Sequence, residues 1–379
     1  MKFSINRAAF IKTLNIVQRA ISSKTTIPSL TGLKIDVTES HIMLTGSNAD
    51  ISIQTTISGA NPDYELTISS TGSVVLPARF FNDIVKKLPD TELIIEVGDN
   101  FQTEIKSGNS EFTINGLDAN GYPHLPEIDS DNTIDLPAEI FREVIGQTVI
   151  AVSKQESRPI LTGVHFTLEQ QKLAAVATDS HRLSQRKVTL PADGDQAYNL
   201  VIPGDSLKEL AYMLDGKKEQ IQMNLSENQA MFNFGTTRFY SRLLEGVYPD
   251  TSRLIPESAT TNIQFSAMDL LAAVERASLL SHESRNNVIK LTINPNDKVV
   301  TITGNSPDVG KVEEDLQPQE ISGEELEISF NPDYLKEALR VFGKINVEVA
   351  FTSSLRPFTI TPVDNDEDFI QLITPVRTF

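Results

Sequence analysis

The chain repeats one pattern of apolar and polar positions three times. Counting from Pro77, Pro203 and Asn331, apolar residues follow four, seven, eight and eleven positions later, the spacing of one buried stripe on an α-helix. Each stripe leads into alternating apolar and polar residues, as in a strand with one buried face. The starting points are 126 and 128 residues apart, so the repeat is a whole domain rather than a solenoid unit. The stripes are Phe81/Ile84/Val85/Leu88, Leu207/Leu210/Ala211/Leu214 and Leu335/Ala338/Leu339/Phe342, and the strands that follow contain residues 93–97, 221–225 and 345–349.

The first half of each repeat recurs as well. It consists of a short strand, a helix and a pair of strands whose connecting turn suits a hairpin. Each repeat therefore predicts an α+β domain in which two helices pack on two antiparallel sheets. The opening strands lie at 3–5, 134–136 and 263–265, the helices near 8–20, 138–150 and 267–279, and the strand pairs at 33–37 with 41–45, 164–168 with 173–177, and 289–293 with 299–303. On the first helix we expect Phe10, Leu14, Val17 and Ile21 to be buried and Lys12, Asn15 and Arg19 to lie on the other side.

Similar proline-containing segments close the first two repeats, at 122–126 and 248–256. Ordinary surface loops can have this composition, but the matching positions favour linkers between domains. We therefore predict three domains, residues 1–128, 129–258 and 259–379. If such units join edge to edge, their helices can line one side of a curved row and their sheets the other. A row of this kind can close into a ring by symmetry.

The charge distribution fits a ring of this kind better than the net charge does. The chain carries a net charge of −18, which taken alone argues against phosphate binding. The predicted helical windows together carry +6, so the rest of the chain carries −24. One set of elements is thus mildly basic inside a strongly acidic protein. The windows are residues 7–24, 79–87, 138–154, 205–218, 267–281 and 333–344.

Several classes of protein are disfavoured by composition. The chain has no cysteine, so disulfides and thiolate metal sites are absent and a reducing compartment is suitable. No apolar run approaches the roughly 20 residues of a membrane span, and the N-terminal residues alternate like a strand rather than forming a signal peptide. There is no glycine-rich phosphate loop, so we expect no nucleotide hydrolysis. We predict a cytoplasmic protein without a cofactor or a metal.

Four segments carry a resemblance to a known family. They are 156–163 (Glu-Ser-Arg-Pro-Ile-Leu-Thr-Gly), 177–183 (Ala-Thr-Asp-Ser-His-Arg-Leu), 248–256, which begins Tyr-Pro-Asp, and 372–377 (Leu-Ile-Thr-Pro-Val-Arg). With them the whole chain resembles the bacterial DNA polymerase III beta subunit family, the beta sliding clamps. The resemblance implies a noncatalytic processivity factor: a head-to-tail homodimer whose six domains form a ring around duplex DNA and tether the replicative polymerase. It also implies a clamp loader that opens the ring with ATP.

In this family a cleft between the second and third domains receives short peptides of partner proteins. The resemblance implies that the partners include the replicative polymerase, the clamp loader, repair polymerases and mismatch-repair proteins. Apolar side chains would receive leucine or phenylalanine anchors of the peptide, and polar groups would orient it. Thr374 stands where the family often has a longer apolar residue, which affects the depth of one subpocket. The implied cleft residues are Arg158, Leu161, Thr178, Ser180, His181, Arg182, Leu183, Pro249, Arg253, Leu254, Leu372, Ile373, Pro375, Val376 and Arg377.

The resemblance also implies DNA-facing residues and a subunit contact. Sliding requires weak, nonspecific phosphate contacts, for which Lys24, Arg79, Lys86 and Gln155 match family positions and Lys154 adjoins them. After Pro203 the chain has Gly204 and Asp205 where some relatives carry two basic residues, so one contact is expected to be weaker. The subunit contact would join the first domain to the third domain of the partner. Its apolar centre would be Phe112, Ile114, Leu279 and Leu280, which could equally be internal core residues.

Two other functions are compatible with parts of the sequence. Asp179, Ser180 and His181 could serve a hydrolase, but adjacency in sequence does not create a triad, and Ser180 lacks a glycine-flanked elbow. A turn with a partly buried histidine is the simpler interpretation. The acidic run 364–368 lacks the glycine and distal glutamate of a calcium loop and is more typical of a solvated turn. A peptide-binding scaffold that never encircles DNA is the remaining alternative.

Overall fold

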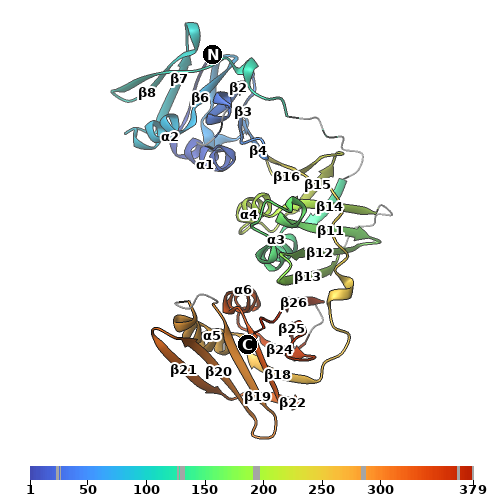
Figure 1. Cartoon of the computed structure of the whole chain (residues 1–379). Helices are drawn as coiled ribbons and strands as arrows, with labels where there is room; N and C mark the ends of the chain where they lie inside the picture. The colour runs from blue at the N-terminus through green and yellow to red at the C-terminus, as the bar shows by residue number, and fades with distance from the viewer. Residues whose placement is uncertain are drawn as a thin grey trace. The chain divides into compact units, whose positions relative to one another are not determined.

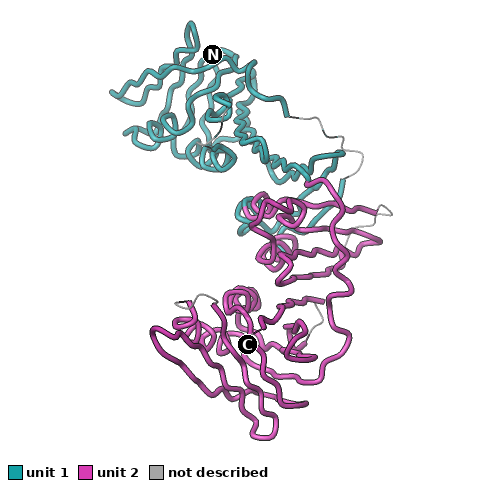
Figure 2. The backbone as a smooth tube through the Cα atoms, in the orientation of Figure 1, with its two compact units in different colours: residues 1–139, 209–243 teal, residues 140–208, 244–379 magenta. Residues whose placement is uncertain are grey.

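The computed structural model describes residues 1–22, 25, 27–125, 128, 133–190, 197–282, 287–364 and 368–377. The chain divides into two compact units, one of residues 1–139 and 209–243 and the other of residues 140–208 and 244–379 (Figure 2). Each of the six predicted helices forms (Figure 1). They are α1 (Arg7–Val17), α2 (Ala78–Lys87), α3 (Ala138–Thr148), α4 (Gly204–Met213), α5 (Ala267–Ser281) and α6 (Pro332–Phe342).

Helices α1, α5 and α6 begin where a polar side chain caps free backbone N–H groups, whereas α2 begins after Pro77 without such a cap. The side chain of Asn6 accepts hydrogen bonds from the N–H groups of Ala8 and Ala9 at the start of α1. Asn331 accepts one from Asp333 at the start of α6, where Pro332 occupies the first helical position. A cap of this kind satisfies donors that the helix itself cannot, and a proline there loses no hydrogen bond.

The buried stripe of α1 is shorter than predicted. Phe10, Leu14 and Val17 are buried as expected, but α1 ends at Val17 and continues as a 3₁₀ turn, η1 (Gln18–Ala20). Ile21 therefore follows the helix and is only half-buried, so its place in the stripe was predicted wrongly. The tighter 3₁₀ turn changes the angle between successive side chains, which moves Ile21 off the helical face.

The first unit contains a five-stranded and an eight-stranded antiparallel sheet. The larger sheet runs without a break from strands of the first repeat into strands of the second, because β4 pairs with β17, with Ile53 opposite Phe239. The smaller sheet has the order β5 (Thr67–Ser70), β1 (Lys2–Asn6), β7 (Glu92–Val97), β8 (Gln102–Ser107), β9 (Ser110–Asn115). The larger has the order β10 (Thr133–Pro137), β15 (Gln220–Leu225), β16 (Gln229–Phe234), β17 (Thr237–Arg242), β4 (Ile51–Ser58), β3 (His41–Ser47), β2 (Gly32–Val37), β6 (Gly72–Pro77).

The second unit contains a nine-stranded and a four-stranded antiparallel sheet. Here β13 of the second repeat pairs with β26 of the third, with Leu183 opposite Leu372. Successive repeats are thus joined edge to edge within each unit. The larger sheet has the order β14 (Tyr198–Pro203), β11 (Gly163–Glu169), β12 (Lys172–Thr178), β13 (Arg182–Thr189), β26 (Phe369–Ile373), β25 (Phe358–Pro362), β24 (Asn346–Phe351), β18 (Thr261–Ser266), β22 (Glu320–Gly323). The smaller has the order β21 (Gly310–Leu316), β20 (Val299–Ser306), β19 (Ile289–Asn294), β23 (Leu326–Phe330).

In the first and third repeats a helix approaches a strand closely at a glycine. Gly46 on β3 lies against the end of α1, and Gly304 on β20, which pairs with Ile289 on β19, lies against α5. A Cβ atom on Gly304 would lie 2.3 Å from the carbonyl oxygen of Ala277 in α5. The glycine therefore allows the helix backbone to rest directly on the strand.

Replacing Gly304 with alanine should destabilise the protein by about 1–3 kcal/mol, because the new methyl group meets backbone that can only move with the whole helix. Gly146, within α3, has no atom within 4 Å of a Cβ built there, so Gly146→Ala is the matched control. The control should be neutral or stabilising by up to about 1 kcal/mol. Thermal unfolding measures both. A Gly304→Ala protein that melts at or above the wild-type temperature would contradict the close approach.

Candidate functional site

The predicted cleft residues come from separate segments of the second unit that contact one another. They lie on the 3₁₀ turn η7 (Pro159–Thr162), on β12, β13 and the turn between them, in the segment that leads into the 3₁₀ turn η8 (Ser252–Leu254), and on β26 and the chain beyond it. Arg158 donates a hydrogen bond to the Ser180 hydroxyl (3.1 Å). Leu161 packs in one apolar cluster with Tyr248, and Leu183 and Leu372 pack in another with Ile255.

The turn between β12 and β13 is held by one carboxylate. Oδ1 of Asp179 accepts hydrogen bonds from the N–H groups of His181 (2.9 Å) and Arg182 (3.0 Å). Its Oδ2 accepts one from Nε of Arg182 (3.0 Å). Between them, Ser180 has a φ of 78°, in the left-handed region that non-glycine residues seldom adopt. The hydrogen bonds of Asp179 stabilise this strained backbone, so the turn presents Ser180 and His181 in fixed positions.

Arg182 links this turn to helix α6. Its side chain is buried, and its guanidinium forms an ion pair with Glu337 as well as with Asp179. The guanidinium carbon lies 4.7 Å from the centre of the Tyr334 ring, and the His181 ring stacks on the same tyrosine at 6.3 Å between ring centres. The two carboxylates and the face of the aromatic ring compensate the guanidinium for the loss of contact with water on burial. The charge of Arg182 is therefore directed at its neighbours rather than at solvent.

The chain beyond β26 is fixed along the same turn. The N–H (2.9 Å) and the hydroxyl (2.8 Å) of Thr374 both donate hydrogen bonds to the carbonyl of His181. Two residues later, the N–H of Val376 donates to the carbonyl of Ser329 (2.7 Å). A longer apolar residue at 374 could not make the hydroxyl contact. The segment thus fixes Val376, which is 39% exposed, against β23.

Five of the predicted cleft residues are buried and form the floor of the site. Leu161, Thr178, Leu183, Leu372 and Ile373 are all buried. The hydroxyl of Tyr248 accepts a hydrogen bond from the N–H of Thr178 (3.0 Å). Burial raises the pKa of Tyr248 to about 12, and the nearby charge of Asp179 acts in the same direction, while the N–H of Thr178 opposes both. The phenol therefore remains neutral at physiological pH.

The remaining predicted cleft residues form the rim. Leu254 and Val376 are exposed apolar side chains, and charged and polar side chains surround them. An apolar patch with a polar border is the arrangement that receives an apolar anchor of a peptide and orients its backbone. The exposed members are Arg158, Ser180, His181, Arg253, Leu254, Val376 and Arg377, and the half-buried ones are Pro249 and Pro375.

The hydrolase alternative finds no support in this geometry. Both carboxylate oxygens of Asp179 are engaged by the turn and by Arg182, and the Ser180 hydroxyl contacts Arg158. Within the described residues no hydrogen bond joins the imidazole ring of His181 to the side chain of Ser180 or Asp179, as a nucleophile and its base would require. His181 is exposed, so the expectation of a partly buried histidine was wrong. It lies at the end of the three-residue turn between β12 and β13 that Asp179 caps, so its ring points away from the sheet.

Tyr334 and Glu337 are components of this site that the sequence reasoning missed. They lie three residues apart on α6, beside its apolar stripe. Nothing in their spacing links them to Arg182, which is 155 residues from Glu337 in the chain. The burial of Arg182 would have indicated that a carboxylate lies beside it. A sequence pattern does not show that a single strand residue is buried.

The residues predicted to face DNA are exposed where the structure describes them. Arg79 and Lys86 lie seven residues apart on α2, on one helix face, and Lys154 and Gln155 lie in the exposed segment after the 3₁₀ turn η6 (Val149–Ala151). In the described part of the chain no carboxylate pairs with Arg79, Lys86 or Lys154. Lys24 lies outside the described residues.

Two other basic residues, Arg19 and Arg340, are neutralised by ion pairs. Nε of Arg19 pairs with Glu209 (2.7 Å), and its guanidinium carbon lies 3.6 Å from the centre of the Tyr212 ring. Arg340 pairs with Glu275 (2.8 Å). Arg19 and Arg340 therefore present less charge to solvent than Arg79, Lys86 and Lys154 do.

The residues predicted for the subunit contact are placed on two surfaces. Phe112 on β9 is 45% exposed and Leu279 on α5 is 70% exposed, whereas Ile114 and Leu280 are half-buried. The alternative that all four are internal core residues is therefore excluded for Phe112 and Leu279. Strand β9 is also an edge strand of its sheet, so one side of its backbone has no strand partner.

The described residues contain neither a cluster of metal ligands nor a membrane-spanning helix. Among the described residues no three histidine or acidic side chains are grouped as metal ligands, and most of the acidic run 364–368 lies outside those residues. None of the helices in the described ranges has the length and apolar character needed to cross a membrane.

Family models for the DNA polymerase III beta subunit match almost the whole chain. The N-terminal domain model matches residues 1–126, the central domain model residues 135–250, and the C-terminal domain model residues 252–377. The chain belongs to the DNA polymerase III beta subunit family. This confirms the identification made from the sequence and the fold class of three clamp domains with helices and antiparallel sheets.

Individual relatives of this beta subunit agree. It is 47% identical over 381 residues to the beta sliding clamp of Bacillus subtilis, with 100% of both chains covered. It is 46% identical to that of Streptococcus pneumoniae, with 99% of both chains covered. The crystal structure of the Bacillus subtilis clamp matches with a TM-score of 0.97 at 46% identity, and that of a Pseudomonas aeruginosa clamp bound to griselimycin with 0.92 at 26%, both over 100% of each chain.

The function predicted from the sequence is that of this family. The beta subunit is a DNA sliding clamp, a processivity factor of DNA polymerase III that is not itself catalytic. The roles of individual site residues and the domain limits stay predictions.

Proposed function

We propose that this sliding clamp works as a homodimeric ring that encircles duplex DNA, with domains at residues 1–128, 129–258 and 259–379. The observation that carries the proposal is the full-length likeness to beta sliding clamps, at 47% identity to that of Bacillus subtilis. Encirclement explains how a chain with a net charge of −18 can hold DNA. A closed ring does not need tight phosphate binding, because it cannot leave the duplex without opening.

The exposed cations support loose contact with phosphates. Arg79 and Lys86 on α2, and Lys154 with Gln155, would face the duplex together with Lys24. A few unpaired side chains give weak, salt-sensitive and sequence-independent contacts, which permit sliding. A protein with this task on bacterial DNA would work in the cytoplasm.

The rim and floor described above are the proposed docking site for partners. The replicative polymerase, the clamp loader, repair polymerases and mismatch-repair proteins would each insert a short peptide there. The exposed Leu254 and Val376 would receive its apolar anchors, and Arg158, Ser180 and His181 would orient its backbone. The Pseudomonas aeruginosa relative solved with griselimycin bound supports the presence of a ligand site in this fold.

Retention on circular DNA tests the ring. The protein is loaded onto nicked plasmid with a matching clamp loader and ATP, passed over a sizing column, and the plasmid is then cut once. We expect retention on the circle and loss after linearisation, because only a topological link depends on closed DNA. Equal behaviour of circular and linear DNA would support the scaffold alternative instead.

The proposed subunit contact predicts a monomeric variant. Replacing Leu279 with alanine and Leu280 with aspartate removes apolar area and would bury a charge at the joint, so the dimer should dissociate. Sedimentation should show a particle of one 41.8 kDa chain. Leu355→Asp, at another exposed leucine, is the control and should leave the dimer intact. A double variant that sediments as a dimer would refute the assigned contact.

The proposed cleft predicts a selective loss of peptide binding. Val376→Asp should weaken binding of a polymerase-derived peptide by about tenfold or more, because the charge must be desolvated against an apolar anchor. Val363→Asp is the matched control, since both valines are 39% exposed and only Val376 belongs to the predicted rim. Fluorescence anisotropy measures both. Equal affinity of the two variants would show that the peptide binds elsewhere.

A further inference from the structure

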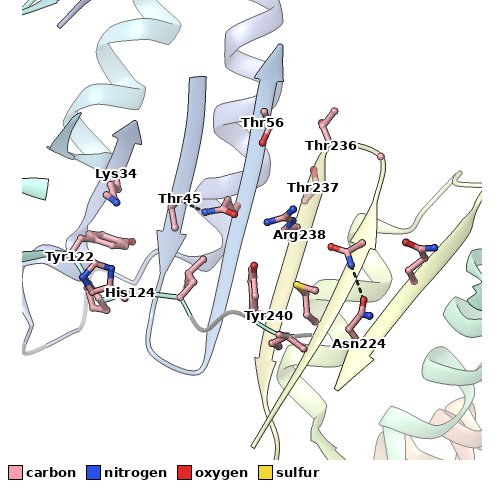
Figure 3. Close-up of a pocket in the computed structure, with 18 of the residues that line it drawn as sticks. Lys34, Thr45, Thr56, Tyr122, His124, Asn224, Thr236, Thr237, Arg238 and Tyr240 are labelled. Atoms are coloured by element: carbon pink, nitrogen blue, oxygen red, sulfur yellow. Dashed lines mark hydrogen bonds between the residues drawn. The ribbon is translucent and has the colours of Figure 1, made fainter. Parts of the chain in front are cut away.

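A pocket of about 820 Å³ lies in the first unit, and none of its lining residues is among those assigned to partner docking. Its floor is one face of the eight-stranded sheet where β4 pairs with β17, and the chain around Tyr122 and His124 forms one side (Figure 3). Figure 3 shows Lys34, Tyr122 and His124 together at one end, Asn224 toward the other, and Arg238 and Tyr240 between them. A volume of this size is typical of small-molecule sites.

The sheet register arranges the floor in rows. Six lining side chains, one on each of six neighbouring strands, lie directly opposite one another across the sheet. Neighbouring strands are about 4.8 Å apart, so the cations at Lys34 and Arg238, three strands apart, are separated by about 14 Å at their Cα atoms. The row runs Lys34, Thr45, Gln54, Arg238, Asn233, Gln222, and a second row beside it runs Tyr240, Met231, Asn224, Thr133.

Hydrogen bonds within the floor orient its amide groups. Nδ2 of Asn233 donates to Oδ1 of Asn224 (3.0 Å), whose own Nδ2 donates to the hydroxyl of Thr133 (2.8 Å). Nε2 of Gln54 donates to the hydroxyl of Thr45 (3.3 Å). In the described chain no protein donor reaches the amide oxygens of Asn233 or Gln54. These oxygens are therefore available to a ligand in fixed positions.

The charges of the pocket select an anion. No carboxylate is among the described lining residues, so a metal ion or an ammonium group would find no counter-charge. Lys34 is neutralised by Asp36 (3.1 Å), whereas Arg238 is exposed and pairs with no carboxylate of the described residues. A long polyanion such as nucleic acid needs several cations along its backbone, and this pocket offers one that is unpaired.

We propose that this pocket binds a small organic anion, which presents one carboxylate or phosphate group to Arg238 and amide-like hydrogen-bonding groups to Gln54, Asn233 and Gln222. The planar guanidinium forms paired hydrogen bonds with either oxyanion. The side chains of Met231 and Tyr240, in the second row, provide the apolar surface for the rest of the molecule.

Isothermal titration of the full-length protein at low salt tests this site. The probes are adenosine 5′-monophosphate and a blocked Asp-Tyr dipeptide, compared with adenosine and a blocked Asn-Tyr dipeptide. We expect at least one anionic probe to bind about tenfold or more tightly than its uncharged counterpart, because the charge-assisted contact is lost in the latter. The two pairs distinguish a phosphate ligand from a carboxylate ligand.

Two arginine variants locate the contact. Arg238→Gln should weaken binding of the anionic probe by about tenfold or more. Arg242→Gln removes the same charge from the same strand at an exposed position outside the pocket, and should change affinity by less than about twofold. Thermal melting shows whether both variants are folded.

Three results would overturn the proposal. The first is that neither anionic probe binds at millimolar concentration. The second is that the two arginine variants bind alike. The third is that a single-stranded oligonucleotide binds while both small probes do not, which would make this face a nucleic-acid surface.

Discussion

The structure depends on main-chain pairing between strands of successive repeats. In the first unit β4 pairs with β17, and in the second β13 pairs with β26. Unpaired edge strands expose a row of backbone donors and acceptors, and pairing two such edges satisfies both rows. Because a register shift of one residue would turn every side chain to the opposite face, each pairing also fixes which residues face each other across the repeat boundary. Each of these two strand pairings, called a seam below, forms part of one candidate site.

The two seams serve different chemistry because different side chains flank them. At β13 and β26 the opposed residues Leu183 and Leu372 are apolar and buried, and they support a rim with exposed leucine and valine. At β4 and β17 the opposed residues Gln54 and Arg238 are polar and reach into a pocket. The same backbone arrangement therefore yields a surface with exposed apolar side chains in one unit and a polar pocket in the other. The difference follows from sequence alone, through alternation along the strands.

The repeated helices and strand pairs could be predicted because their signals are local. The apolar stripes of α2, α4 and α6 and the hairpins of β2, β11 and β19 each depend on residues within about one element length. What could not be predicted is which edge strand meets which. The alternation of apolar and polar residues indicates which face of β17 is buried, but it does not indicate that β4 is its neighbour. In the same way, the sequence around Arg182 does not indicate that Glu337 and Tyr334 lie beside it. The ligand pocket at Arg238 was missed for the same reason.

Ion pairing separates the basic residues that are proposed to contact DNA from those that are neutralised. Arg19 and Arg340 are held by Glu209 and Glu275, so each pair contributes little net field at a distance. Arg79, Lys86 and Lys154 have no carboxylate partner among the described residues and keep their full charge. In a protein with a net charge of −18, a few unpaired cations cannot produce tight binding. For a protein that must move along DNA this weakness is suitable, because strong phosphate contacts at fixed positions would oppose sliding, and a closed ring supplies the retention that charge does not.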